Sequence, residues 1–325
     1  MKFKVLALIA FTALFASDLH GQDRPDTSTH TVQFVPVDQD VKLEVLDWGG
    51  TGQPMIFLAG GGRTAHDYDE FAPKFTAKYH VYGITRRGFG ASSKPAPTAV
   101  NYAADRLGDD VLAVMNALKL NRPVLIGHSL AGEELSSIGS RYPEKVAGLI
   151  YLDAAYPWAF YDQTKGDSWL DMLAVKKDLD ALAAGATYDR AFVQDLSASV
   201  SQLAKDMPDE AKRLASMPGG APGAPPPISL AMLFGEQKYT KIPVPILAIS
   251  AVPHNLDDAP GDAATKAALK AADLARTTAL ANTFEVGVPS AHVLRIANAD
   301  HTIFRSNEAE VLRDMDSFLN ELPQP

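Results

Sequence analysis

The stretch Val124-Leu-Ile-Gly-His-Ser-Leu-Ala-Gly132 indicates how the rest of the chain folds. An apolar run typical of a buried strand leads through a small residue to Ser129, and a helical pattern opens after it. A serine on such a tight turn from strand to helix is pushed out above the sheet. Its neighbours must be small because the backbone there is strained and closely approached. The spacing departs from a strict G-x-S-x-G, since Ala131 occupies the last position and Gly132 follows it.

Strand and helix patterns alternate on both sides of this turn. The expected strands cover residues 31–35, 41–46, 55–58, 81–85, 124–126, 146–152, 244–250 and 293–297. The expected helices cover residues 104–118, a segment after Ala131, and residues 308–319. Continuous apolar strands that alternate with helices predict an α/β fold with a mostly parallel sheet and helices on both faces. The first two strands are joined too closely for a crossover helix, so we expect them to form an antiparallel leading edge.

Composition excludes several classes of protein. The 325 residues are 46% hydrophobic and 21% charged, which is ordinary for a globular protein. A net charge of −9 and the absence of a basic run disfavour a nucleic-acid surface. Without cysteine the chain has neither disulfides nor a catalytic thiol. No metal-ligand spacing such as H-E-x-x-H appears, so we expect neither a metal nor a cofactor.

The first residues have the pattern of a signal peptide. Lys2 and Lys4 precede an apolar run at 5–16, and small and polar residues follow. The run is too short to span a bilayer and suits the apolar region of a signal peptide, although a buried N-terminal helix is the alternative. Cleavage after Gly21 is favoured, and Ala16 also fits. We therefore expect export to the periplasm or the medium, with no membrane association after cleavage.

The sheet pattern is interrupted between residues 156 and 241. The patterning there is helical but less regular, and the Pro- and Gly-rich stretch 217–227 suits neither a helix nor a central strand. An insertion at the C-terminal edge of a parallel sheet is where a lid would sit, although an ordinary helical subdomain has the same pattern. Its apolar residues fit either a pocket for an acyl or aromatic group or a small core of its own; they are Trp158, Phe160, Trp169, Leu170, Met172 and Leu173. The expected organisation is a signal peptide (1–21), a first core segment (22–155), a helical lid or cap insertion (156–241) and a second core segment (242–325).

Four motifs in order resemble the α/β-hydrolase fold family, over nearly all of the chain after the signal peptide. They are residues 58–62 after an early strand, 85–92 after the next strand, 127–132 around Ser129, and 298–301 after the last strand. Their order and spacing are more specific than any one of them. The resemblance implies a serine esterase- or lipase-like hydrolase.

The resemblance also implies roles for single residues. Ser129 is the expected nucleophile and His301 its general base. The backbone N–H groups of Gly61 and Leu130 are the expected oxyanion hole. His128 adjoins the nucleophile but should point off the other side of the strand end. The remaining weaker candidates, which no motif supports, are His66, His80, His254 and His292.

The acid of the triad has two candidates. Many relatives place it after the strand that corresponds to 244–250, where Asp257 is available but late. Some members, haloalkane dehalogenases among them, place it at the strand end where Asp153 lies. We favour Asp153 over Asp257, because a triad is recognised by geometry and not by chain order.

The expected function is acyl transfer to water, in which an exported serine carboxylesterase cleaves a small-molecule ester, thioester or lactone. Dehalogenases and epoxide hydrolases of this fold use an aspartate nucleophile, so Ser129 argues against both. The alternatives are a C–C bond hydrolase or a cofactor-free, haloperoxidase-like perhydrolase on the same triad, and a non-catalytic ligand-binding member of the fold.

Overall fold

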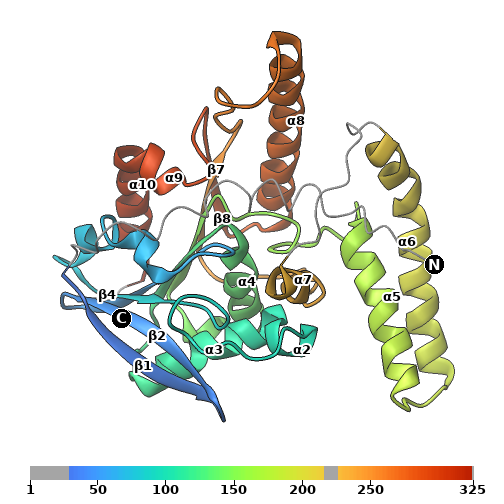
Figure 1. Cartoon of the computed structure of the whole chain (residues 1–325), viewed down its shortest axis with the longest axis horizontal. Coiled ribbons are helices and arrows are strands. Elements are labelled where there is room, and N and C mark those ends of the chain that lie inside the picture. The colour runs from blue at the N-terminus through green and yellow to red at the C-terminus, as the bar shows by residue number, and fades with distance from the viewer. Residues whose placement is uncertain (1–28, 216–225, 324–325) are drawn as a thin grey trace.

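The strands expected on either side of Ser129 form one eight-stranded sheet in the computed structural model, which describes residues 29–215 and 226–323. The strand order is β1-β2-β4-β3-β5-β6-β7-β8 (Figure 1). The strands are β1 Thr31–Asp38, β2 Val41–Gly49, β3 Gln53–Leu58, β4 Tyr79–Ile84, β5 Val124–His128, β6 Gly148–Leu152, β7 Ile246–Ala251 and β8 Ala291–Ile296. β2 pairs antiparallel with β1 and with β4, and every other pair is parallel. The predicted fold class, with its antiparallel leading edge, is therefore confirmed.

The chain also has helices and short 3₁₀ turns, most of which cover the two faces of this sheet. They are η1 Ala65–Tyr68, η2 Ala72–Phe75, α2 Ala99–Tyr102, α3 Ala104–Ala117, η3 Ser129–Ala131, α4 Gly132–Arg141, η4 Pro143–Lys145, α5 Ser168–Ala183, α6 Arg190–Ala215, α7 Pro227–Leu233, α8 Ala263–Gly287, α9 Ile303–Ser306 and α10 Glu308–Glu321. Along β5, Leu125 packs with α3, α4 and α8, whereas Val124 and Ile126 pack with η1, η2, α9 and α10. Each parallel strand thus buries both faces, as its continuous apolar run requires.

Helix α8 was not expected from the sequence. It is the crossover that joins the parallel strands β7 and β8. Its 25 residues are rich in alanine, and only Thr277, Ala281 and Phe284 are buried, all in its second half. Asp262 caps its first turn by accepting from the Thr265 backbone N–H at 2.8 Å. Helix propensity and this cap therefore define α8 more than an apolar stripe does.

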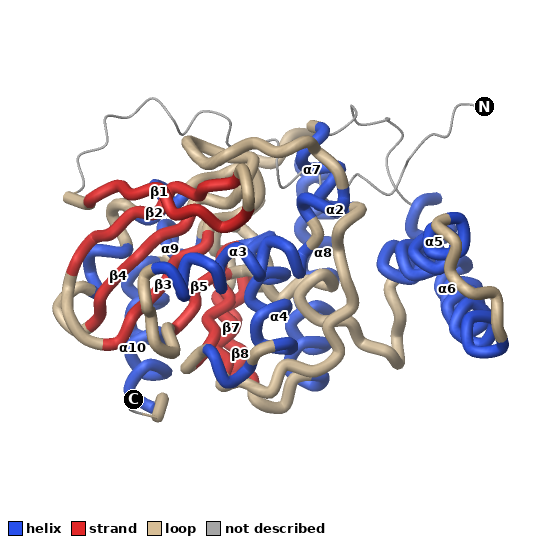
Figure 2. The backbone as a smooth tube through the Cα atoms, turned by 90° about the horizontal axis from the view of Figure 1, so that it is seen from below, coloured by secondary structure: helices blue, strands red, loops and turns tan. Residues whose placement is uncertain are grey.

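The segment predicted as the insertion carries α5, α6 and α7. Helices α5 and α6 lie side by side and apart from the sheet (Figures 1 and 2). Leu170 and Leu173 pack with Tyr161 in a small cluster that Trp169 also contacts, while Trp158 and Phe160 belong to the main core. Met172 is exposed. Except for Met172, these apolar side chains therefore contribute to cores, and the division into hydrolase core and lid stays a prediction.

Two sequence features lie wholly or mostly outside the described residues. They are the predicted signal peptide at 1–21 and most of the Pro- and Gly-rich stretch 217–227. Among the helices that the structure does describe, none has the length and apolar character needed to cross a bilayer.

Glycines set how closely α4 approaches the sheet at the serine turn. A Cβ on Gly132 would lie 2.2 Å from the backbone oxygen of Ala154, so only glycine fits there. A Cβ on Gly127 would lie 3.1 Å from the Cβ of Ala131. The close approach therefore requires glycine at 132 and tolerates one methyl group at 131, which accounts for the departure from the strict spacing.

Gly132→Ala should lower the free energy of unfolding by more than about 3 kcal/mol, because no rotamer relieves a clash with a backbone oxygen. The control is Ala131→Gly, which restores the strict spacing without adding an atom and should cost about 1 kcal/mol or less. Urea denaturation of both variants measures the difference. A Gly132→Ala protein as stable as the wild type would show that the approach is not tight.

Candidate active site

Ser129 lies at the junction of β5 and η3 in a strained backbone conformation. Its φ of +53° is in the left-handed region, which residues other than glycine seldom adopt and which costs about 1–3 kcal/mol. The turn directs the hydroxyl toward the carboxyl ends of the parallel strands. There Ser129 Oγ lies 2.8 Å from Nε2 of His301, which follows β8. The structure thus brings the two residues together as predicted.

Asp153 is the acid that meets this histidine. It directly follows β6, has a φ of +45°, and places Oδ2 2.6 Å from His301 Nδ1. A carboxylate only accepts hydrogen bonds, so Nδ1 carries the proton and Nε2 is free to accept from the Ser129 hydroxyl. The other oxygen, Oδ1, accepts from the Ala251 backbone N–H at 3.0 Å. Asp257 lies elsewhere, exposed and paired with Lys270 at 2.6 Å, so the structure does not bring it to the site.

The charge of Asp153 is held by its hydrogen bonds. Its burial disfavours the charged form, but the hydrogen bonds from His254 and His301 outweigh that penalty and hold the pKa of Asp153 well below its usual range. His254 donates to Oδ2 from Nε2 at 2.8 Å. The sequence offered no motif for His254. Its position directly after β7, beside the ends of β6 and β8, is the signal that could have pointed to it.

The loop after β3 packs directly against Ser129. A Cβ on Gly60 would lie 3.4 Å from Ser129 Cβ and 2.8 Å from His128 Nδ1. Gly61 is the next residue of this loop, and Leu130 follows Ser129 in η3, so the two backbone segments flank the serine. The role of their N–H groups as the oxyanion hole stays a prediction.

His128 differs from the expectation that it points away from the site. Its Nε2 donates to the backbone oxygen of His301 at 2.9 Å, and the two rings are 4.6 Å apart. His128 lies two residues after Ile126 on the same face of β5, where its ring is 5.4 Å from that of Phe304 in α9, beside the loop after β8. Burial and, to a lesser degree, the charge of the nearby His301 lower the pKa of His128 to about 3. His128 is therefore a neutral donor that supports the His301 loop.

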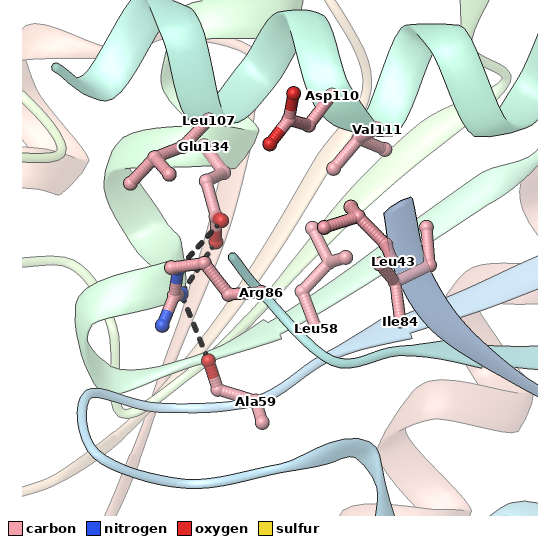
Figure 3. A pocket seen from close by; sticks show the side chains of 9 residues that line it. All are labelled: Leu43, Leu58, Ala59, Ile84, Arg86, Leu107, Asp110, Val111 and Glu134. Atoms are coloured by element: carbon pink, nitrogen blue, oxygen red, sulfur yellow. Dashed lines mark hydrogen bonds and ion pairs between the residues drawn. The ribbon is translucent and has the colours of Figure 1, made fainter. Parts of the chain in front are cut away.

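Arg86 ties the Gly60 loop to α4. Its guanidinium donates to the backbone oxygens of Ala59 and Gly60 at 2.9 and 3.2 Å. It also forms two bonds to Glu134, at 2.7 and 2.6 Å (Figure 3). Burial disfavours the charged form, but the charge and hydrogen bonds of Glu134 outweigh it and raise the pKa of Arg86. Arg86 belongs to a family motif in which the sequence suggests no role for it. Its contacts show that it connects the Gly60 loop to α4.

Two groups of described residues have the donor atoms to hold a metal ion. One is His30, His66 and Asp69, and the other is Asp153, His254 and His301. In the second group each donor atom already takes part in a hydrogen bond of the triad. In the first, His66 Nδ1 lies 3.0 Å from Asp69, at ordinary hydrogen-bond distance. Hydrogen bonds and ion pairs account for both groups.

Comparison with known proteins identifies the family of the chain. The model of the alpha/beta hydrolase fold family matches residues 53–219, about half of the chain. The chain belongs to the alpha/beta hydrolase fold family. This alpha/beta hydrolase is 29% identical to a fluoroacetate dehalogenase of Burkholderia sp over 35% of its own length and 38% of the relative's. It is 30% identical to a bifunctional esterase/perhydrolase of Acinetobacter calcoaceticus over 38% of its own length and 45% of the relative's. The matched regions thus span less than half of either relative.

Solved structures show the same fold. The crystal structure of E-2-(acetamidomethylene)succinate hydrolase aligns with a TM-score of 0.55 and 19% identity. The alignment covers 90% of this chain and all of that one. The sheet is thus that of an alpha/beta hydrolase.

Arg86→Gln should lower kcat at least tenfold, because the loop before Gly61 loses the donor that holds its carbonyl groups. It should also destabilise the fold by about 3–5 kcal/mol by leaving Glu134 buried and unpaired. The matched control is Arg87→Gln. Arg87 is equally buried in a two-bond pair with Asp110, at 2.6 Å each, and its other partners are Asn101 and Asp38, which lie outside the loop.

The control should therefore lose stability but keep kcat. Denaturation curves of both variants measure the loss of stability, and steady-state kinetics measure kcat. Equal losses of kcat in the two variants would contradict a positioning role for Arg86.

Proposed function

We propose that this alpha/beta hydrolase is a serine hydrolase that cleaves carboxylic esters, or a related thioester or lactone, through an acyl-enzyme on Ser129. The observation that carries the proposal is the continuous chain of contacts from Ser129 Oγ through His301 to Asp153, at 2.8 and 2.6 Å. Each atom in it has the donor or acceptor character that nucleophilic catalysis needs.

The geometry supports a two-step reaction. His301 Nε2 takes the hydroxyl proton while Ser129 Oγ attacks the carbonyl carbon of the substrate, and Asp153 stabilises the imidazolium that forms. In this proposal the backbone N–H groups of Gly61 and Leu130 donate to the oxyanion. His301 then gives its proton to the leaving alcohol. Water, deprotonated by the same nitrogen, releases the acid from Ser129.

The nucleophile favours this chemistry over that of several relatives. Dehalogenases and epoxide hydrolases of the fold use aspartate where this chain has Ser129. The esterase/perhydrolase relative supports ester cleavage, and its name also supports perhydrolysis, in which peroxide replaces water in the second step. Both activities require the same acyl-enzyme.

Hydrolysis of p-nitrophenyl esters from acetate to palmitate tests the proposal. Ser129→Ala should lower kcat at least about 10³-fold, because the nucleophile is gone. Asp153→Asn should lower it by about 10⁴-fold, because the amide favours the wrong tautomer of His301. Asp257→Asn is the control, and its exposed side chain predicts unchanged kinetics.

Three results would contradict the proposal. They are ester cleavage that survives Ser129→Ala, no turnover of any ester by the folded protein, and a loss confined to Asp257→Asn. Adding hydrogen peroxide to the same assay measures perhydrolysis, which should also disappear in Ser129→Ala.

We also propose that the protein is exported, on the pattern of its first 21 residues. Expression of the full chain in a Gram-negative host should give a periplasmic protein whose N-terminus, read by Edman sequencing, is Gln22. Replacing Leu6 and Leu8 by arginine should block export, because charges interrupt the apolar run. A cytoplasmic protein that keeps Met1 would overturn export.

A further inference from the structure

A second histidine contacts the acid of the triad. His254 follows β7 and is buried, and its Nε2 lies 2.8 Å from Asp153 Oδ2, the oxygen that also meets His301 Nδ1 at 2.6 Å. Because the carboxylate only accepts, His254 Nε2 must carry a proton. Asp153 therefore receives two imidazole N–H groups on one oxygen.

The other nitrogen of His254 faces a second carboxylate. Its Nδ1 lies 3.1 and 3.2 Å from the two oxygens of Asp273 in α8, and its backbone N–H donates to the same group at 2.8 Å. Nδ1 must then also carry a proton. A histidine whose two nitrogens both donate to carboxylates is an imidazolium, so the geometry assigns a positive charge to His254.

The surroundings of His254 balance that charge. Arg276 donates to Asp273 at 2.9 Å and lies over the ring of Tyr156, whose hydroxyl is 3.4 Å from Asp153 Oδ2. The ring of His301 is 5.9 Å from that of His254. The two aspartates and the two cations, His254 and Arg276, cancel in charge. A neutral His254 would leave two carboxylates, of which Asp153 is buried, sharing one cation, which makes the packed arrangement less stable.

The same contacts shift the pKa values of the cluster. Burial opposes the charge of His254, but its bonds to Asp153 and Asp273 raise its pKa from 6.5 to about 9. Burial likewise opposes the charge of Asp273, and its bonds to His254 lower its pKa to about 2. The raised pKa of His254 makes its contribution to stability complete below pH 6.5 and lost as pH rises through about 9.

We propose that His254 is a positioning residue whose imidazolium keeps Asp153 aimed at His301, so that loss of its proton switches the triad off at alkaline pH. The proposal rests on the proposed function of Ser129, His301 and Asp153. Once His254 loses a proton, its ring can donate to only one of the two carboxylates, and a lone pair faces the other. The orientation of Asp153 is then no longer held.

NMR of protein labelled with [15N]histidine tests the charge without any substrate. His254, assigned by its absence in His254→Gln, should show two protonated nitrogens at pH 7.5 and titrate near pH 9. Asp273→Asn keeps an acceptor for Nδ1 but removes its charge, so the titration should move down by about one pH unit or more. A neutral His254 at pH 7.5 would overturn the proposal, whether or not the protein cleaves esters.

Kinetics test the coupling to catalysis. The wild-type kcat/KM should fall with an apparent pKa near 9, and Asp273→Asn should move this limb down with the NMR titration. At pH 8.5 that variant should retain about threefold less of its pH 7 activity than the wild type. His254→Gln should lower kcat at least about tenfold with little change in KM. The kcat/KM of this variant should not show the fall near pH 9. His292→Gln, an exposed histidine on β8, is the control and should leave the profile unchanged.

The outcomes separate this proposal from the proposed function. Turnover that depends on Ser129, with an alkaline limb that Asp273→Asn does not move, would overturn the role of His254 alone. A charged His254 in a protein whose ester cleavage survives Ser129→Ala would overturn the proposed function, and with it the coupling to catalysis.

Discussion

One carboxylate oxygen, Oδ2 of Asp153, accepts from both His301 and His254, and the carboxyl ends of three neighbouring strands meet around it. Asp153 follows β6, His254 follows β7 and His301 follows β8. A buried carboxylate is costly unless its oxygens are paired. The parallel pairing of these strands supplies the partners from residues far apart in the chain. The arrangement that satisfies Asp153 is also the one that orients His301 toward Ser129.

A second buried pair has the corresponding role on the other side of the serine. Arg86 and Glu134 neutralise each other while Arg86 holds the carbonyl groups of Ala59 and Gly60. Glu134 belongs to α4, the helix that opens after the serine turn, so the Gly60 loop and the nucleophile share one rigid support. The strain at Ser129 and the tight approach at Gly132 persist because these packed elements leave no alternative.

Much of the fold could be predicted because apolar periodicity reports burial directly. Ser129, His301 and Asp153 could be proposed because each follows a recognisable strand. Helix α8 was missed because its alanine-rich sequence carries no clear apolar stripe. The contact of His254 with Asp153 joins residues 101 positions apart, and no local spacing encodes it. The apolar residues of the insertion could line a pocket or build a core, because composition does not distinguish the two.

Reaction with a fluorophosphonate, followed by peptide mapping, tests the central claim most directly, because it reads the nucleophile and its activation without assuming a substrate. The account predicts one adduct per chain, on Ser129, formed at least about 10³-fold more slowly in Asp153→Asn, with Asp257→Asn unchanged. An adduct on another residue, no reaction of the folded protein, or labelling of Asp153→Asn at the wild-type rate would contradict it.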